Sequence, residues 1–274
     1  IYRYVWDGQV LVAGFNPYEL APDAPELVPL RDQLWSELAH RDIPTVYPPL
    51  AQGLFALSAT LPASVYALKA ILVLLDVAAC SLLLLLARRW RLPSHRVIWY
   101  AWNPLVVVEI AGMGHIDGLG VAMVVLTTTW LAFARRRVLL PAAATAAGAV
   151  LAKLVPLLAL PIWARQSGRR WLFFSVALLL VLLGLLPVVG TTGGVPPGLV
   201  EYGISWEFNG PLFEPLWRLL DHTPLHDTAQ TGLDRLKQVT GRSDPWDSIY
   251  HYNYPQFWAK ILLSAGLLVS LVWA

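Results

Sequence analysis

The first eighteen residues, IYRYVWDGQVLVAGFNPY, combine one guanidinium and one carboxylate with several aromatic rings. The Arg3 guanidinium is suited to bind the oxygens of a donor phosphate, and the Asp7 carboxylate could take a proton from a hydroxyl group as a catalytic base. Because aromatic faces stack on the C–H surfaces of sugars, Trp6, Asn16 and Tyr18 are candidates for binding the sugar or the acceptor. The same composition also fits an interfacial aromatic belt with a structural Asp7–Arg3 ion pair.

A second group of candidate residues lies in MGHIDG, residues 113–118. His115 and Asp117 stand between glycines, which allow another group to approach closely, and both are candidate catalytic residues. Glu109 lies two turns earlier in an apolar stretch, where ionisable residues are costly and often functional, although a helix–helix hydrogen bond would also explain it. Asp76 has the same structural explanation. Since two ligands alone make a weak metal site, we predict no metal ion and no other cofactor.

Two further candidates come later in the chain. Lys153, in LAKLVP, is suited to bind a donor phosphate as a compact charge, or could instead extend to the membrane interface. Trp206, Glu207 and Asn209, in SWEFNGP, have the composition of a carbohydrate-binding platform, or of a loop that packs on the first one. The sequence contains no Walker loop, dinucleotide fingerprint, serine elbow or HExxH motif.

The elements that must position these residues are membrane helices. Hydrophobic residues make up 57% of the chain and charged residues only 14%, whereas a soluble domain is about one quarter charged. Cys80 is the single cysteine, so the chain has no disulfide framework. A membrane-spanning helix needs about 20 apolar residues, and the sequence predicts an all-α polytopic bundle. The predicted spans are residues 63–87, 97–111, 118–134, 138–152, 154–164, 171–189 and 256–274, of which 138–164 form a hairpin of broken helices.

The distribution of charge predicts the orientation of this bundle. Ten arginines lie in the connections 88–96, 135–137 and 165–170, which contain no acidic residue. Since positively charged loops remain in the cytoplasm, these connections are predicted to be cytoplasmic and the candidate residues to face outward. We expect one membrane domain over 1–274, truncated at both ends. It consists of an outer loop (1–62) with interfacial helices at 24–40 and 48–61, helices with short loops (63–189), a second outer loop (190–255) with an amphipathic helix near 232–239, and a last helix (256–274).

Five motifs occur in order along the chain: RYVWDG…GFNPY, TVYPPLAQ, NPLVVVEIAGMGHIDG, LAKLVPLLALP and WEFNGPLFEP. Together they resemble the C-type (GT-C) integral membrane glycosyltransferases, in particular the bacterial polyprenyl-phosphate-mannose-dependent mannosyltransferases. The resemblance covers most of the chain, from Ile1 to about Pro215.

The resemblance implies an all-helical fold with interfacial helices in the first outer loop and a catalytic aspartate early in that loop. In close relatives we expect an aspartate directly ahead of Ile1, and within this sequence Asp7 is the early carboxylate. Asp117 matches the acidic second outer turn of the family, and Lys153 matches the lysine of its broken hairpin. The implied partners are a polyprenyl-phosphate sugar donor, a lipid-linked or glycan acceptor and membrane lipids, without nucleic acid.

The implied reaction is a direct displacement at the outer face of the bacterial plasma membrane. The acceptor hydroxyl loses its proton to a carboxylate, and the polyprenyl phosphate leaves with its charge stabilised by Arg3 and Lys153. Two other functions remain open on the sequence: a lipid or solute transporter or flippase, and a non-catalytic membrane scaffold. A transporter would be expected to show two related halves with broken helices, and only one broken hairpin is visible.

Overall fold

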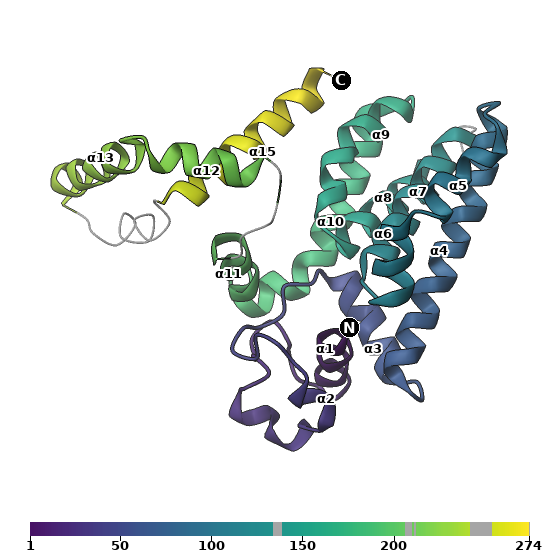
Figure 1. The fold of residues 1–274 in the computed structure, drawn as a ribbon, viewed down its shortest axis with the longest axis horizontal. Helices are drawn as coiled ribbons and strands as arrows, with labels where there is room; N and C mark the ends of the chain where they lie inside the picture. Colours follow the sequence, from purple (N-terminus) through teal and green to yellow (C-terminus); the bar gives the residue numbers. More distant parts are fainter. Residues whose placement is uncertain (134–138, 206–209, 211, 242–253, 274) are drawn as a thin grey trace. The chain divides into compact units, whose positions relative to one another are not determined.

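The computed structural model describes residues 1–133, 139–205, 210, 212–241 and 254–273 (Figure 1). Every regular element in these ranges is helical, which confirms the all-α fold. The chain forms two compact units, unit 1 over Ile1–Leu199 and unit 2 over Val200–Ala274. Each unit is described by itself.

A layer of four helices forms the apolar body of unit 1. In this layer α4 packs on α7, α7 on α8, and α8 on α10 (Figure 1). The contact surface of α8 consists largely of buried alanines, which allow its neighbours to approach closely. The four helices are α4 (Ser64–Arg89), α7 (Asp117–Phe133), α8 (Leu139–Ala152) and α10 (Arg170–Thr192).

Two of these helices, α4 and α10, are long and apolar enough to cross a membrane. A third span results only if Pro104–Gly112 and α7 are counted together, although the chain bends by 119° between them. Among the described residues this is fewer than the seven predicted spans. The helix α8 has 14 residues, or about 21 Å at 1.5 Å per residue, against a hydrocarbon core of about 30 Å.

The segment predicted as one span over 97–111 is broken into short pieces. Pro104 fixes the backbone at the start of a new helix, and the Asn103 side chain accepts a hydrogen bond from the Leu105 amide at 3.0 Å. A π-helical turn follows and ends at the glycine before Met113. The pieces are η2 (Ser94–Val97), α5 (Ile98–Ala101), α6 (Pro104–Val106) and η3 (Val107–Gly112).

The broken hairpin after α8 is present as predicted. A short 3₁₀ turn that begins next to Pro156 replaces the continuation of the helix, and α9 resumes after it. These elements are η4 (Val155–Ala159) and α9 (Leu160–Gln166).

The N-terminal segment differs from the sequence prediction, because residues predicted as loop form the helix α1 (Tyr2–Val12). This helix packs on α3 (Pro49–Ala59), which corresponds to the short helix predicted over 48–61. Gly8 makes the contact possible, since a Cβ atom at this position would overlap the Phe55 carbonyl group. Burial against α3 therefore stabilises a helix that its own sequence only weakly favours.

The helix predicted over residues 24–40 is also divided. Pro29 lies inside the 3₁₀ helix η1 (Pro25–Leu30), and the side chain of Asp32 begins the separate α2 (Gln33–Ser36) by accepting a hydrogen bond from the Trp35 amide. Two guanidinium groups contact the Trp35 ring, that of Arg31 at 4.6 Å and that of Arg41 at 4.4 Å from the ring centroid.

Unit 2 contains α12, which packs on α15, and the exposed helix α13. The predicted amphipathic segment at 232–239 lies within α13, and the predicted last span corresponds to α15. The last helices of the chain are α11 (Pro197–Ser205), which begins at the end of unit 1, and α12 (Phe213–Asp221), α13 (Leu225–Thr240) and α15 (Pro255–Trp273) of unit 2.

Candidate functional site

Asp117 and Lys153 form an ion pair at one end of the helix layer. Asp117 is the first residue of α7, and Lys153 directly follows α8. Because α7 and α8 pack against each other, the Lys153 ammonium meets the Asp117 carboxylate. Both side chains are about two fifths exposed, at 44% and 42%, so the pair is open to a ligand. The structure thus brings together two residues that the sequence predicted separately.

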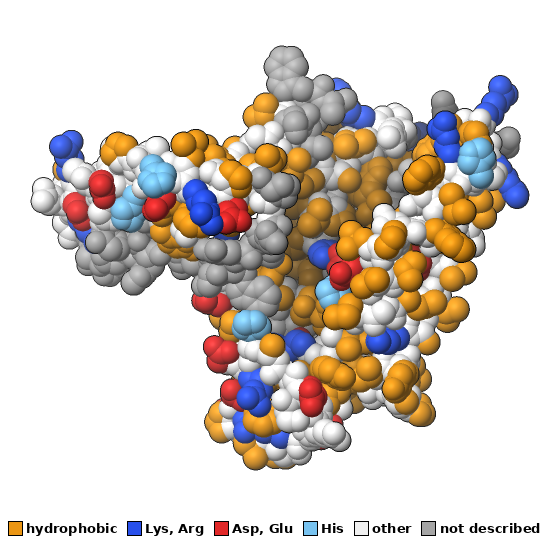
Figure 2. Space-filling model, in the orientation of Figure 1, with side chains coloured by type: hydrophobic (Ala, Val, Ile, Leu, Met, Phe, Trp, Pro, Cys, Tyr) orange, Lys and Arg blue, Asp and Glu red, His pale blue; other side chains and the backbone are white. Residues whose placement is uncertain are grey.

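The turn before Asp117 carries a second polar pair. His115 Nδ1 lies 3.1 Å from Glu109 Oε2, and both side chains are partly exposed. The π-helical turn brings them together, because the His115 amide donates to the Glu109 carbonyl at 2.9 Å across a wide loop of backbone. Gly114 has φ +71°, a left-handed conformation that glycine adopts readily. Near the turn, Figure 2 shows charged side chains of both signs interrupting a largely hydrophobic face.

An aromatic cluster joins α1 to this turn. The Tyr4 ring stacks on Phe55 at 4.7 Å between centroids, and Tyr47 meets both rings edge-on. Tyr4 also packs in the buried apolar cluster that contains Ile110 and Ile116. Burial raises the pKa of Tyr4, and the negative charge of Asp117 raises it further. Tyr4 is therefore a neutral group close to the Asp117–Lys153 pair.

Asp7 lies on α1 one turn after Arg3, in a buried environment. Arg3 Nε donates to Asp7 Oδ1 at 2.8 Å, while the two terminal nitrogens donate to the carbonyls of His40 and Ile43. The other Asp7 oxygen accepts a hydrogen bond from Gln52 at 3.4 Å. Burial raises the pKa of Asp7, and the Arg3 charge opposes this effect. Asp7 is 1% exposed. Because Arg3 also binds the carbonyls of His40 and Ile43, the ion pair connects α1 to the loop after α2.

The three predicted sugar-binding residues of the first segment have structural contacts. Trp6 is 1% exposed and packs with Val10 and Leu27 in the core. The Asn16 side chain accepts a hydrogen bond from the Tyr18 amide at 3.0 Å, as in an Asx turn. The Tyr18 hydroxyl donates to the Tyr47 carbonyl at 2.7 Å. Their role in binding a sugar stays a prediction, and Trp206, Glu207 and Asn209 lie outside the described residues.

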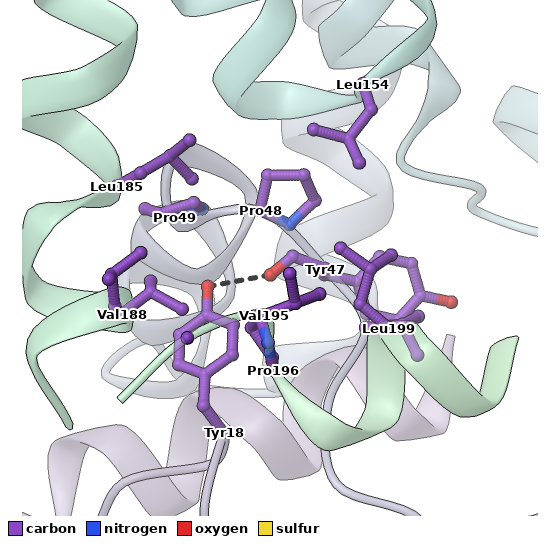
Figure 3. A pocket seen from close by; sticks show the side chains of 13 residues that line it. Tyr18, Tyr47, Pro48, Pro49, Leu154, Leu185, Val188, Val195, Pro196 and Leu199 are labelled. Carbon is purple, nitrogen blue, oxygen red and sulfur yellow. Dashed lines mark hydrogen bonds between the residues drawn. The ribbon is translucent and has the colours of Figure 1, made fainter. Parts of the chain in front are cut away.

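An apolar cavity of about 470 Å³ lies next to the polar site (Figure 3). Leu154, the residue after Lys153, points into it, and Tyr47 connects it to the aromatic cluster. Tyr18 forms one side, and the C-terminal part of α10 forms another. The cavity is lined by Tyr18, Val46, Tyr47, Pro48, Pro49, Leu154, Leu185, Val188, Val189, Gly194, Val195, Pro196 and Leu199.

The sequence analysis missed the contributions of Tyr4, Tyr47 and Gln52 to this region. Gln52 donates to Thr45 at 2.7 Å as well as to Asp7, and thereby connects α3 to the buried ion pair. A signal was present, because Tyr47 and Gln52 both belong to the motif TVYPPLAQ. Within the described ranges, no three His, Cys, Asp or Glu side chains are grouped to hold a metal ion.

Comparison with known families gives one match. Residues 1–167, more than half of the chain, match the family described as alpha-(1->6)-mannopyranosyltransferase, N-terminal domain. The matched region includes both ion pairs and the turn that carries His115. No curated protein and no solved structure matches the chain.

Proposed function

The chain belongs to the alpha-(1->6)-mannopyranosyltransferase family and is a membrane glycosyltransferase, and from this premise we propose its donor, acceptor and orientation. The donor is mannose carried on a polyprenyl phosphate, and the acceptor is a hydroxyl group of a lipid-linked or free glycan. The reaction takes place at the outer face of the bacterial plasma membrane. A nucleotide sugar is disfavoured as the donor, because nucleotide pools are cytoplasmic and the arginine-rich connections predict that the site faces outward.

One observation carries this proposal: the residue that directly follows a lysine of the polar site lines an apolar cavity. Lys153 is part of a half-exposed ion pair, and the next residue, Leu154, lines the cavity of about 470 Å³. A polyprenyl phosphate has the same two parts, an anionic phosphate joined to a long hydrocarbon chain. With the phosphate at Lys153, the first isoprene units would enter the cavity. Such a ligand would also replace Asp117 as the partner of the ammonium and free the carboxylate.

The reaction then follows from the charges at the site. The acceptor oxygen attacks the anomeric carbon of mannose, the bond from that carbon to the phosphate oxygen breaks, and a carboxylate takes the hydroxyl proton. Polyprenyl phosphate leaves as an anion, which the Lys153 ammonium stabilises. No proton has to reach the leaving group, since the phosphate is already a stable anion.

Accessibility decides which carboxylate we assign to the proton. Asp117 is 42% exposed, whereas Asp7 is enclosed and bonded to Arg3. We therefore assign proton abstraction to Asp117 and a positioning role to the His115–Glu109 pair in the turn before it. The catalytic role of Asp7 and the phosphate-binding role of Arg3 stay predictions.

The test is mannosyl transfer in membranes that contain the full-length protein. Labelled polyprenyl-phosphate mannose is supplied with candidate glycan acceptors, and kcat and KM are measured separately. Asp117→Asn keeps the shape but not the basicity of the side chain, and is expected to lower kcat by about 10²- to 10⁴-fold. Lys153→Gln is expected to raise KM for the donor and to lower kcat as well.

Two control variants distinguish charge at the site from general damage. Lys153→Arg keeps the charge and is expected to retain more activity than Lys153→Gln. Lys69→Gln removes a nearby ammonium that binds the Gly112 carbonyl at 2.6 Å, and is expected to have the smaller effect. Full activity of both Asp117→Asn and Lys153→Gln would refute the assignment, as would efficient transfer from a nucleotide sugar.

A further inference from the structure

A second groove in unit 1 lies at the arginine-rich end of α4. It has a volume of about 420 Å³ and is formed between the last turns of α4 and the segment from η2 to Asn103. One wall consists of hydrocarbon, with Leu83 and Leu86 from α4. The other wall presents Arg96, and Trp90 and Trp99 lie at the edge. The groove therefore joins an apolar surface to a cationic one.

The wall opposite α4 is held in place by a specific contact. The Tyr100 hydroxyl donates to Asp76 Oδ1 at 2.6 Å, which fixes α5 against the middle of α4. The η2 turn also packs on α4. Because this contact does not involve Arg96, the groove is formed by the fold and does not depend on the guanidinium that faces it.

The positive charge at this end of α4 is not neutralised by any group in the part of the chain that the structure describes. The sequence has no acidic residue from 77 to 108. Arg89 is engaged with the Ala132 carbonyl and the Phe133 ring, but the guanidinium groups of Arg88, Arg91 and Arg96 are exposed and make no hydrogen bond or ion pair with the described residues. Figure 2 shows Lys and Arg side chains gathered at the end of unit 1 where Figure 1 draws α5.

The groove and the Asp117 turn lie near opposite ends of α4. Near its start, α4 reaches the Asp117 turn through Lys69, and near its end it reaches the groove at Trp90. The intervening 20 or so residues span about 30 Å at 1.5 Å per residue, which equals the thickness of the hydrocarbon core. Trp99 is 79% exposed and Trp90 is 52% exposed, as is typical of tryptophans at headgroup depth.

We propose that this groove binds an anionic phospholipid of the leaflet opposite the Asp117 site. Arg96 binds the phosphate, Arg88 and Arg91 strengthen the local positive potential, and one acyl chain lies along Leu83 and Leu86. Basic pockets between membrane helices bind lipid headgroups in this way. The apolar wall favours a lipid over a free phosphate ion, since a small anion would leave the hydrocarbon surface uncovered.

The test uses the purified full-length protein in a neutral detergent. Dioleoyl phosphatidylglycerol is titrated into the micelles, and lipid binding is measured both from the rise in the thermal unfolding temperature and from retained lipid in native mass spectrometry. Arg96→Gln is expected to weaken phosphatidylglycerol binding about tenfold, as for the loss of a charge-assisted hydrogen bond. Arg165→Gln, an exposed arginine on another predicted cytoplasmic connection, is the matched control and is expected to bind as the wild type does.

Four outcomes would overturn the proposal. Equal losses for Arg96→Gln and Arg165→Gln would show attraction to net charge without a site. Unchanged binding by Arg96→Gln would exclude the groove. Equal binding of phosphatidylcholine would remove the requirement for an anionic lipid, and equal stabilisation by inorganic phosphate would make the ligand a soluble anion. Arg96→Lys is expected to retain lipid binding, and each variant is expected to have the wild-type unfolding temperature in the absence of lipid. These two results separate loss of charge from loss of fold.

Discussion

At the scale of single residues, the two carboxylate–cation pairs have opposite environments. The Asp7 side chain is 2% exposed and that of Arg3 is 18% exposed, whereas the Asp117 and Lys153 side chains are both more than 40% exposed. An exposed pair contributes about 0–1 kcal/mol and can exchange partners at little cost. A buried pair cannot lose one member without leaving an uncompensated charge. The exposed pair is therefore suited to binding and chemistry, and the buried pair to holding the fold.

Arg3→Met tests the structural role of the buried pair. The variant leaves the Asp7 carboxylate without its cation and two backbone carbonyls without their donor. We expect the free energy of unfolding to fall by about 3 kcal/mol at neutral pH, measured by denaturant or thermal unfolding in detergent. Arg165→Met, at an exposed position, is the control and is expected to change little. Equal stability of the two variants would argue against this role.

The loss of unfolding free energy caused by Arg3→Met is expected to depend on pH. Without the guanidinium, only Thr45 and Gln52 oppose the effect of burial, and the pKa of Asp7 rises further above the unfolded value of about 3.9. The folded variant then favours the protonated form of Asp7. The loss of unfolding free energy is therefore largest above the pKa of Asp7 in the folded variant, and it shrinks as the pH falls toward 4 and Asp7 becomes protonated. Unfolding of wild type and variant across this range checks the prediction, and Arg3→Met combined with Asp7→Asn should lose the dependence.

The sequence identified individual chemical groups better than their pairing. Asp117 and Lys153 were candidates because of their residue types and positions, but they are 36 residues apart. Their contact depends on how α7 packs on α8 and on where α8 ends. The Arg3–Asp7 pair was an alternative on the opposite charges of the two residues alone, because the segment was predicted as loop and not as a helix. Its burial was not visible, since it results from α3 and the loop after α2.

At the scale of elements, the close contact of α1 with α3 positions the N-terminal residues. Gly8→Ala tests this contact, because the added methyl group would overlap the Phe55 carbonyl and the Ala56 amide. We expect a loss of about 1–3 kcal/mol in unfolding free energy. Gly53→Ala is the matched control on α3, where the methyl group meets nothing within 4 Å. The control should be neutral or stabilising by up to about 1 kcal/mol, and a similar loss for both would contradict the packing argument.

The apolar cavity gives a prediction about the length of the donor chain. Val195 lines the cavity and is 63% exposed, so Val195→Trp is expected to fold and to fill part of the space. KM for a long-chain polyprenyl-phosphate mannose should rise about tenfold, or about 1.4 kcal/mol, and that for a donor with few isoprene units should change less. Leu186→Trp, an exposed position on α10 outside the cavity lining, is the control. Equal effects on both donors would place the lipid elsewhere.

Long apolar runs predicted the main helices to within a few residues, because a continuous run of about 20 apolar residues is itself the signal of a membrane-spanning helix. The sequence did not predict α1, which has 11 residues and would be marginal without its partner. The division of residues 97–111 could have been predicted in part, since Asn103-Pro104 is a helix-start signal. The sequence analysis gave more weight to the continuous hydrophobic run and predicted one span.

At the scale of the whole molecule, the predicted orientation separates the two sites across the membrane. A direct check uses single cysteines in a background where Cys80, the native cysteine, is replaced by alanine. Ser36→Cys and Ser94→Cys are both exposed positions. An impermeant maleimide should label the first in intact cells and the second only after permeabilisation. The reverse pattern would place the glycosyltransferase site on the cytoplasmic side and would reopen the choice of donor.

The π-helical turn Val107–Gly112 also has a consequence for mutational study. Such a turn holds one residue more than an α-helical turn, and each residue of an α-helix advances it by about 100°. Removal of one residue would let an ordinary helix form and swing Glu109 away from His115 without altering either side chain. The contact between Glu109 and His115 thus depends on the number of residues in this turn as well as on their identity. Alanine scanning keeps that number and would overlook the effect, whereas the deletion of a single residue is expected to abolish activity.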